Sequence, residues 1–178
     1  MNTEQRSCRA GTSVAVRFPC VEDMRDMYSI AFDNPWSFRW CTNTALLPFE
    51  GFRASVWHQT RLRLVIIQPR SGEVRGAAVF WTFQEPIETL NLDVPMKLPL
   101  VAVEFWEGLS LALGYWAEID VARKVFLNIP ASIYSELRDG IDPRLIEEGR
   151  LKDFFWINGK ADDLVCISTN RSDWLLTV

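Results

Sequence analysis

Two carboxylates in one strand-like segment could transfer protons. The segment "IETLNLDV", residues 87–94, carries Glu88 near its start and Asp93 near its end, and carboxylates are common general acids and bases. Apolar and polar residues alternate along it, which predicts a strand. Because side chains alternate across a strand, Glu88 and Asp93 point to opposite faces, so only one of them can face a given cleft.

The next stretch, "DVPMKLPLVAVEFW" at residues 93–106, leads from this strand into a helix without a glycine. Apolar residues cover most of the helical circumference from Leu100 to Glu118, which predicts a largely buried helix. A helix amino terminus in this position is a common phosphate site, since free N–H groups and a positive partial charge face the ligand. Pro99, however, has no N–H group, and Leu100 adds a side chain beside it.

Other reactive side chains are few. The chain has one histidine, His58, and four cysteines with no Cys-x-x-Cys pair. This pattern disfavours a zinc site and a disulfide framework. We expect His58 to be exposed, and no histidine stands at a spacing that would activate Cys41 as a nucleophile. The sequence therefore predicts neither a metal site nor cysteine-dependent chemistry.

Composition narrows the class of protein. The 178 residues fit one domain, with 48% hydrophobic and 24% charged residues. The net charge of -4, with the basic residues spread along the chain, argues against nucleic acid or an anionic membrane as a partner. No apolar stretch approaches the ~20 residues of a membrane helix, and the polar amino terminus lacks a signal core. We expect a cytoplasmic protein with a disordered tail at residues 1–12 and a single domain at 13–178.

Hydrophobic periodicity predicts an α/β domain, that is, a mixed sheet with helices. Turn chemistry at Ser71-Gly72 and Asn158-Gly159 indicates two hairpins. The expected elements are strand 13–18, helix 20–32, short helix 48–59, hairpin strands 61–68 and 74–84, strand 87–94, helix 100–118, strand 124–130, helix 131–139, and hairpin strands 147–157 and 161–169.

The carboxy-terminal segment "EEGRLKDFFWINGKADDLVCISTNRSDW", residues 147–174, resembles the final hairpin of Gcn5-related N-acetyltransferases, the GNAT superfamily. The similarity is to the branch that includes ribosomal-protein N-terminal acetyltransferases. Upstream, "VRFPCVEDMRDMY" and "SGEVRGAAVFW" resemble the opening strand and helix and the first hairpin of that superfamily, so the resemblance covers residues 13–176. It implies a central mixed sheet split between its fourth and fifth strands, with an acyl coenzyme A such as acetyl-CoA bound in the split.

The resemblance also implies particular contacts. The family's pyrophosphate signature falls on residues 97–102, where Lys97 and Ala102 fit it and Leu100 replaces a glycine. Glu104 stands where many relatives have a glutamate. The implied coenzyme A contacts are Val94, Met96, Lys97, Leu98, Leu100, Val101 and Ala102. The implied catalytic residues are a base, Glu88 or Asp93, and Tyr134 as the acid that protonates the leaving thiolate.

Three functions stay open at this stage. The first is transfer of an acyl group to a small-molecule or peptide amine, with bacterial specialised metabolism as one setting and a homodimer as one assembly. The second is a GNAT-like protein that has lost coenzyme A and serves as a binding or partner protein. The third is a different reaction that does not use coenzyme A. Loss of two phosphate donors, at roughly 1.5–3 kcal/mol each, would move a micromolar dissociation constant towards millimolar.

Overall fold

The structure, a computed structural model, describes residues 8–34, 48–55, 60–82, 88–157 and 159–175. Its strands are β1 (Arg9–Ala10), β2 (Ala15–Arg17), β3 (Thr60–Ile67), β4 (Val74–Trp81), β5 (Thr89–Asp93), β6 (Lys124–Pro130), β7 (Ile146–Ile157) and β8 (Lys160–Asn170). Its helices are α1 (Met24–Asp33), α3 (Phe49–Ser55), α4 (Ala102–Ile119), α5 (Ala131–Leu137) and the 3-10 helix η1 (Arg171–Asp173). Each element predicted from the sequence has a counterpart among them.

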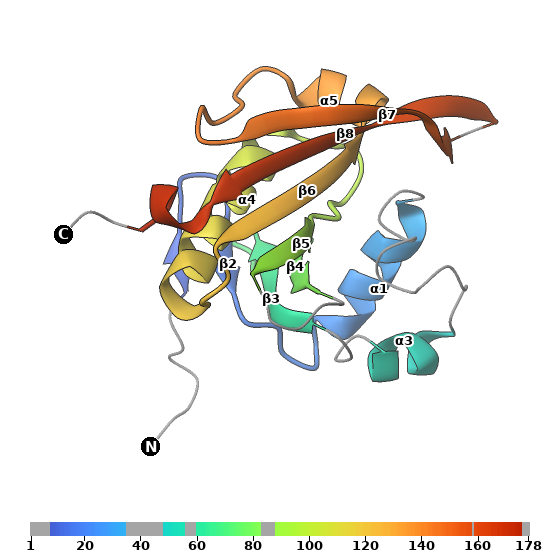
Figure 1. The fold of residues 1–178 in the computed structure, drawn as a ribbon. Helices are drawn as coiled ribbons and strands as arrows, with labels where there is room; N and C mark the ends of the chain where they lie inside the picture. Colours follow the sequence, from blue (N-terminus) through green and yellow to red (C-terminus); the bar gives the residue numbers. More distant parts are fainter. Residues whose placement is uncertain (1–7, 35–47, 56–59, 83–87, 158, 176–178) are drawn as a thin grey trace.

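The strands form one mixed sheet in the order β1-β2-β3-β4-β5-β6-β8-β7 (Figure 1). Neighbours are antiparallel except β5 and β6, which are parallel and paired from Thr89 with Lys124 to Leu92 with Leu127. Beyond Leu127, β6 continues along β8 to Pro130, while the chain after β5 stays beside β4. The sheet is therefore split after Leu92, as predicted, and the predicted fold class is confirmed.

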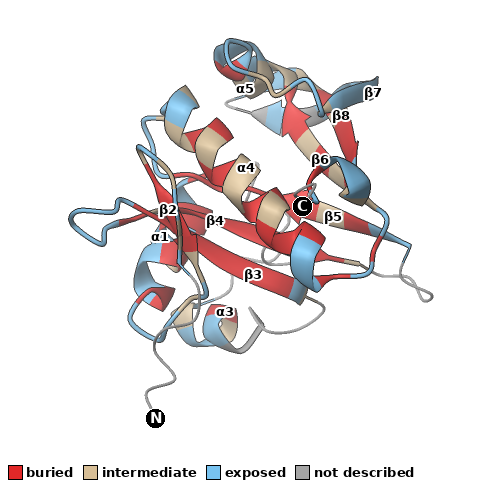
Figure 2. Cartoon of the chain, turned by 90° about the vertical axis from the view of Figure 1, so that its left-hand side faces the viewer, coloured by how far each residue is buried: buried red, intermediate tan, exposed pale blue. Residues whose placement is uncertain are grey.

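Helices cover both faces of the sheet (Figure 2). On one face α4 packs against the inward side chains of the strands, and Phe105, Leu109 and Trp116 are almost fully buried. On the other face α1 and α3 cover a smaller apolar cluster that includes Met27 and Phe52. Because α4 is apolar around most of its circumference, it fills the larger core, as the sequence predicted.

The predicted disorder of residues 1–12 is wrong for the part that the structure describes. Arg9 and Ala10 form β1 against β2. The carboxylate of Glu107 on α4 accepts hydrogen bonds from the backbone N–H groups of Thr12 at 2.6 Å, Ser13 at 2.7 Å and Val14 at 2.9 Å. The polar composition of residues 1–12 gave no sign of these hydrogen bonds, because the carboxylate that accepts them lies on α4, far along the chain.

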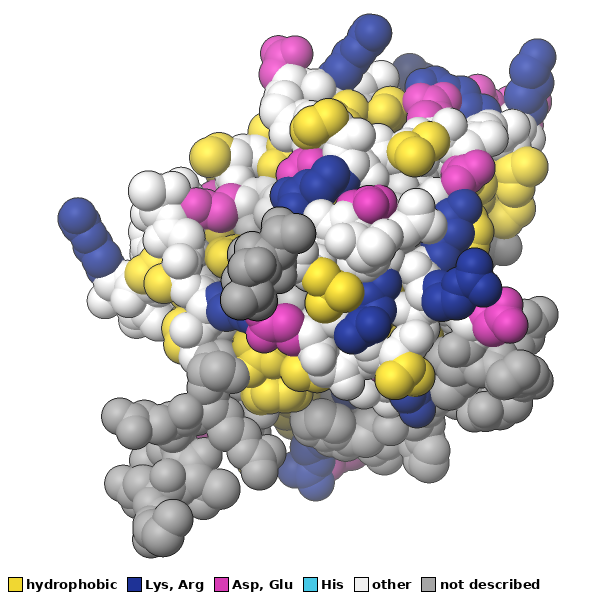
Figure 3. Space-filling model, turned by 60° about the vertical axis from the view of Figure 1, so that its left-hand side comes forward, with side chains coloured by type: hydrophobic (Ala, Val, Ile, Leu, Met, Phe, Trp, Pro, Cys, Tyr) yellow, Lys and Arg dark blue, Asp and Glu magenta, His cyan; other side chains and the backbone are white. Residues whose placement is uncertain are grey.

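Several expectations concern residues outside the described ranges: His58 and Cys41 fall there, as do residues 1–7. Within the described residues, no helix combines the length and hydropathy needed to cross a membrane. On the face shown in Figure 3, basic and acidic side chains are interspersed. The predicted homodimer stays a prediction, although the edge strand β7 exposes Leu151 and Trp156.

Candidate active site

The chain that leaves the split pairs with β4 on one side and, among the described residues, has no strand partner on the other, although Val94 and Met96 are buried there. The N–H of Ala77 on β4 donates to the carbonyl of Pro95 at 3.0 Å, and the N–H of Lys97 donates to the carbonyl of Arg75 at 2.7 Å. Since successive residues of a strand direct their polar groups to opposite sides, Val94 and Met96 direct theirs away from β4, to the side that β6 has left.

One polar group on this open side is engaged. The Met96 carbonyl accepts a hydrogen bond at 2.6 Å from Nδ2 of Asn34, the buried residue that ends α1. Within the described residues, the N–H groups of Val94 and Met96 make no backbone hydrogen bond. An extended ligand that carries amides could pair with such an edge, in the way a peptide adds to a sheet.

Asp93 lies at the point where the sheet splits. Its side chain is 3% exposed and accepts a hydrogen bond from Nε1 of Trp81 at 2.9 Å, on the face covered by α1 and α3. Burial raises the pKa of Asp93 to about 8, and the hydrogen bond from Trp81 opposes part of that rise. A carboxyl group whose pKa lies near neutral pH can both accept and release a proton under ordinary conditions.

Glu88, the other predicted carboxylate, lies elsewhere. It is exposed, and its carbonyl accepts a hydrogen bond from the N–H of Arg123 at 2.9 Å, beside the start of β6. Five residue steps along the strand, or ~16 Å, separate it from Asp93. Glu88 therefore stands at the closed end of the β5–β6 pair, and Asp93 is the carboxylate that the fold brings to the split.

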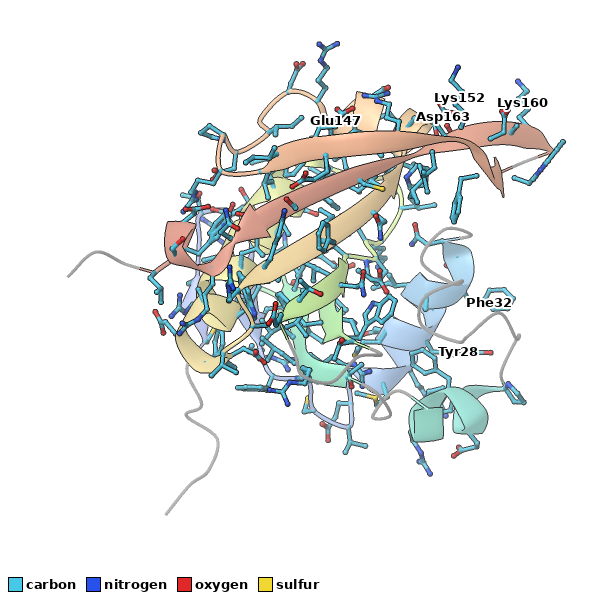
Figure 4. All side chains as sticks on the ribbon, viewed as in Figure 1. Tyr28, Phe32, Glu147, Lys152, Lys160 and Asp163 are labelled. Carbon is cyan, nitrogen blue, oxygen red and sulfur yellow. The ribbon has the colours of Figure 1, made fainter. Side chains whose placement is uncertain are left out.

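Tyr134 lies on α5, directly after β6, and is half-buried. Burial and the negative charge of Glu147 raise the pKa of Tyr134. The guanidinium of Arg150 lies 5.7 Å from the centre of the tyrosine ring. Glu147 lies on β7 (Figure 4), so the carboxy-terminal hairpin supplies the charge that favours the protonated form of this hydroxyl.

The predicted phosphate loop carries a cation that is already paired. Nζ of Lys97 lies 2.5 Å from Oε1 of Glu73, the residue just before β4. The same carboxylate lies 3.6 Å from Nη1 of Arg75, and Nε of Arg75 donates at 3.0 Å to Glu104 in the first turn of α4. The hydrogen bond from Lys97 is the main reason that the pKa of Glu73 is lowered. Positive and negative side chains therefore alternate here, in the order Lys97, Glu73, Arg75 and Glu104.

Leu100 and its neighbours form the start of α4. Helix α4 begins at Ala102, after Val101 in an extended conformation without a side-chain cap. Leu98 and Val101 are exposed, while Leu100 packs against the larger core. The side chain that replaces the family's glycine is therefore turned inward, and it contributes to packing.

A cavity of about 200 Å³ lies between this loop, α1 and the start of β4. Its lining includes the carboxylates of Asp26, Asp33 and Glu73 and a single ammonium group, that of Lys97. This excess of negative charge disfavours a pyrophosphate at the same place. Among the described residues, no three His, Cys, Asp or Glu side chains are grouped closely enough to hold a metal ion.

Comparison with known proteins identifies the fold. No family model matches the sequence, and no curated protein matches it either. Solved structures do match. A spermidine N-acetyltransferase from Vibrio cholerae, in complex with CoA and spermine, superposes with a TM-score of 0.65 at 16% identity, covering 92% of this chain and 99% of that one.

Two further solved structures agree. The ribosomal-protein-S5-alanine acetyltransferase from Vibrio fischeri has a TM-score of 0.64 at 12% identity, covering 94% of this chain and 98% of that one. A GNAT-family acetyltransferase from Bacillus anthracis has a TM-score of 0.62 at 11% identity, covering 93% and 99%. This chain has the GNAT fold, so the resemblance seen in the sequence is confirmed at the level of the fold.

Some residues of the site were not predicted. Trp81 was not expected to hold Asp93, because their contact depends on the register of β4 and β5, which places Val79 opposite Asp93. Glu73 was not expected to hold Lys97. The sequence offered one sign of this pair, the opposite charges of Glu73 and Arg75 beside a strand end. Such a charge pattern is too common to identify a functional pair.

Proposed function

We propose that this protein is an N-acyltransferase that moves an acyl group from a pantetheine thioester, such as acetyl-CoA, to a small-molecule or peptide amine. The observation that carries the proposal is the split after Leu92, where the free edge at Val94 and Met96 runs beside Asp93. The pantetheine arm contains two amides and ends in the reactive sulfur. An arm paired with this edge would bring its thioester close to the carboxyl group of Asp93.

The reaction needs one base and one acid. A neutral amine attacks the thioester carbonyl, so that a C–N bond forms and the C–S bond breaks. Asp93, in its carboxylate form, accepts the proton that the amine nitrogen loses, and the Tyr134 hydroxyl donates a proton to the leaving sulfur. Release of the proton from Asp93 to solvent and uptake of one by Tyr134 restore both groups.

The solved relatives support an amine as the acceptor. By their names, one acetylates spermidine and another an alanine of ribosomal protein S5. At 12–16% identity, these relatives support the class of reaction for this chain. The identity of the acceptor and a place in bacterial specialised metabolism belong to our proposal, as does a location in the cytoplasm.

A second candidate function follows from the loop. Lys97 is paired with Glu73, and Pro99 offers no N–H group, so two features of a coenzyme A site are weakened. If the split takes no thioester, the protein would be a binding or partner protein, or would catalyse a reaction that does not use coenzyme A.

One titration separates the two candidates. Acetyl-CoA and acetyl-pantetheine are each titrated into the protein in a calorimeter, and release of free thiol is then followed with a panel of primary amines. The proposal expects saturable heat with at least one thioester and amine-dependent thiol release. No heat with either thioester at millimolar concentration would favour the second candidate.

A further inference from the structure

Lys97 is the one cation that the family's signature would offer to pyrophosphate, and Glu73 already neutralises it. Their side chains are 47% and 42% exposed, and the nitrogen–oxygen distance is 2.5 Å. Such an exposed pair is weak and could open. Opening it would leave the carboxylate of Glu73 facing the incoming phosphate, so the loop gains no net attraction.

The second cation nearby is committed as well. Arg75 lies between the carboxylates of Glu73 and Glu104, at 3.6 and 3.0 Å. Glu104 stands in the first turn of α4, where the helix terminus would otherwise favour an anion. Together with Asp26 and Asp33 in the adjoining cavity, four carboxylates face two cations.

The unpaired strand edge at Val94 and Met96 does not carry this excess of negative charge. Val94 and Met96 are 0% and 1% exposed and offer neutral backbone N–H groups, which a ligand can reach only after the groups that cover them move aside. Hydrogen bonds between neutral amides do not depend on the charge around the loop. The two halves of a coenzyme A molecule would therefore meet very different surfaces.

We propose, on the basis of the function proposed above, that this site selects its acyl donor by the pantetheine arm, and that Glu73 cancels the contribution of the pyrophosphate. The donor class is an acylated pantetheine arm for which the nucleotide half is dispensable. Glu73 is then a specificity residue, since its charge sets the preference between donors with and without pyrophosphate.

The test compares two donors on four proteins. Dissociation constants of acetyl-CoA and acetyl-pantetheine are measured for the wild-type protein, Glu73→Gln, Lys97→Gln and a matched control, Glu50→Gln. Glu50 is paired with Arg53 on α3 at 2.9 Å and is exposed, so its substitution removes a similar charge far along the chain from the loop.

We expect the wild-type protein to bind the two donors within about threefold of each other. Glu73→Gln should tighten acetyl-CoA about five- to tenfold at low salt, less at high salt, and leave acetyl-pantetheine unchanged. Lys97→Gln should weaken acetyl-CoA binding by a similar factor, because it leaves the carboxylate of Glu73 unpaired, and Glu50→Gln should change neither donor.

Two results would overturn the inference while leaving the proposed function intact. One is a wild-type preference for acetyl-CoA of more than about thirtyfold, which corresponds to roughly 2 kcal/mol from the nucleotide half. The other is an unchanged ratio of the two constants in Glu73→Gln. If neither thioester binds, the proposed function is wrong and the inference is wrong with it.

Discussion

Nε1 of Trp81 donates a hydrogen bond to Oδ2 of Asp93 across 2.9 Å, between neighbouring strands at the point where the sheet splits. The indole fixes the direction of the carboxyl group, while burial favours its neutral form. A carboxyl group held in this way is suited to take a proton from an amine at the thioester.

Replacement of Asp93 by asparagine should lower kcat by about 10²–10⁴-fold with little change in donor affinity, because the base is lost and the hydrogen bond from Trp81 can be kept. Thiol release and calorimetry measure the two quantities. Glu88→Gln, at the other end of the strand, should retain nearly full activity. A loss confined to Glu88→Gln would assign the base to Glu88 instead.

The activity of the wild-type protein should rise with pH and level off above about 8, since Asp93 must be ionised to accept the proton and its pKa is about 8. A profile of kcat/KM between pH 6 and 9.5 checks this. A profile that is flat across pH 7–9 would contradict the assignment of Asp93 as the base.

Asp93 should also make stability depend on pH. Its pKa is raised in the folded state to about 8 from its ordinary value of 3.8, so the folded state holds a proton that the unfolded state loses. The free energy of unfolding therefore falls as pH rises between those values, by at most about 1.4 kcal/mol per pH unit from this group. Urea unfolding at pH 5.5 and 7.5 should show this fall in the wild-type protein relative to Asp93→Asn. An equal change in the free energy of unfolding between the two pH values in both proteins would contradict it.

Tyr134→Phe should lower kcat by about 10–10²-fold without a change in donor affinity, because the sulfur loses its proton donor. Glu147→Gln, which weakens the hold of β7 on the hydroxyl, should have a smaller effect. The activity of each variant is compared after circular dichroism confirms the fold. Full activity of Tyr134→Phe would remove this residue from the mechanism.

Leu100→Gly should destabilise the protein by about 1–3 kcal/mol, because a side chain packed against the core is lost. Glycine alone should not restore coenzyme A binding, since Glu73 and Pro99 are unchanged. Thermal unfolding and a titration with acetyl-CoA check both parts. A clear gain in acetyl-CoA affinity would show that Leu100, and not the local charge, limits binding.

The elements of the fold could be predicted because their signals are local. The alternating segment 124–130 coincides with β6, and the apolar run from Leu100 to Glu118 coincides closely with α4. The split itself was predicted from the resemblance, since parallel strands that diverge leave no mark in periodicity. The disorder expected over residues 1–12 does not hold at residues 9–12, because Arg9 and Ala10 pair with β2 and the distant carboxylate of Glu107 accepts a hydrogen bond from the N–H of Thr12.

The site was predicted only in part. Asp93 was recognised by its residue type, but its environment depends on the register of β4 and β5, which brings Trp81 beside it. The pairing of Lys97 with Glu73 joins residues 24 positions apart, so no local pattern could reveal it. Ion pairs between residues on different strands can be identified only from the three-dimensional structure.

The claim that an acyl-pantetheine arm pairs with the open edge of the split can be tested residue by residue. Amide hydrogen exchange at Val94 and Met96 is measured by NMR with and without saturating acetyl-pantetheine, with an amide inside α4, such as that of Leu113, as the reference. The account predicts markedly slower exchange at Val94 and Met96 and none of this slowing at Leu113. Unchanged exchange at both edge amides, while the donor is bound, would contradict the account.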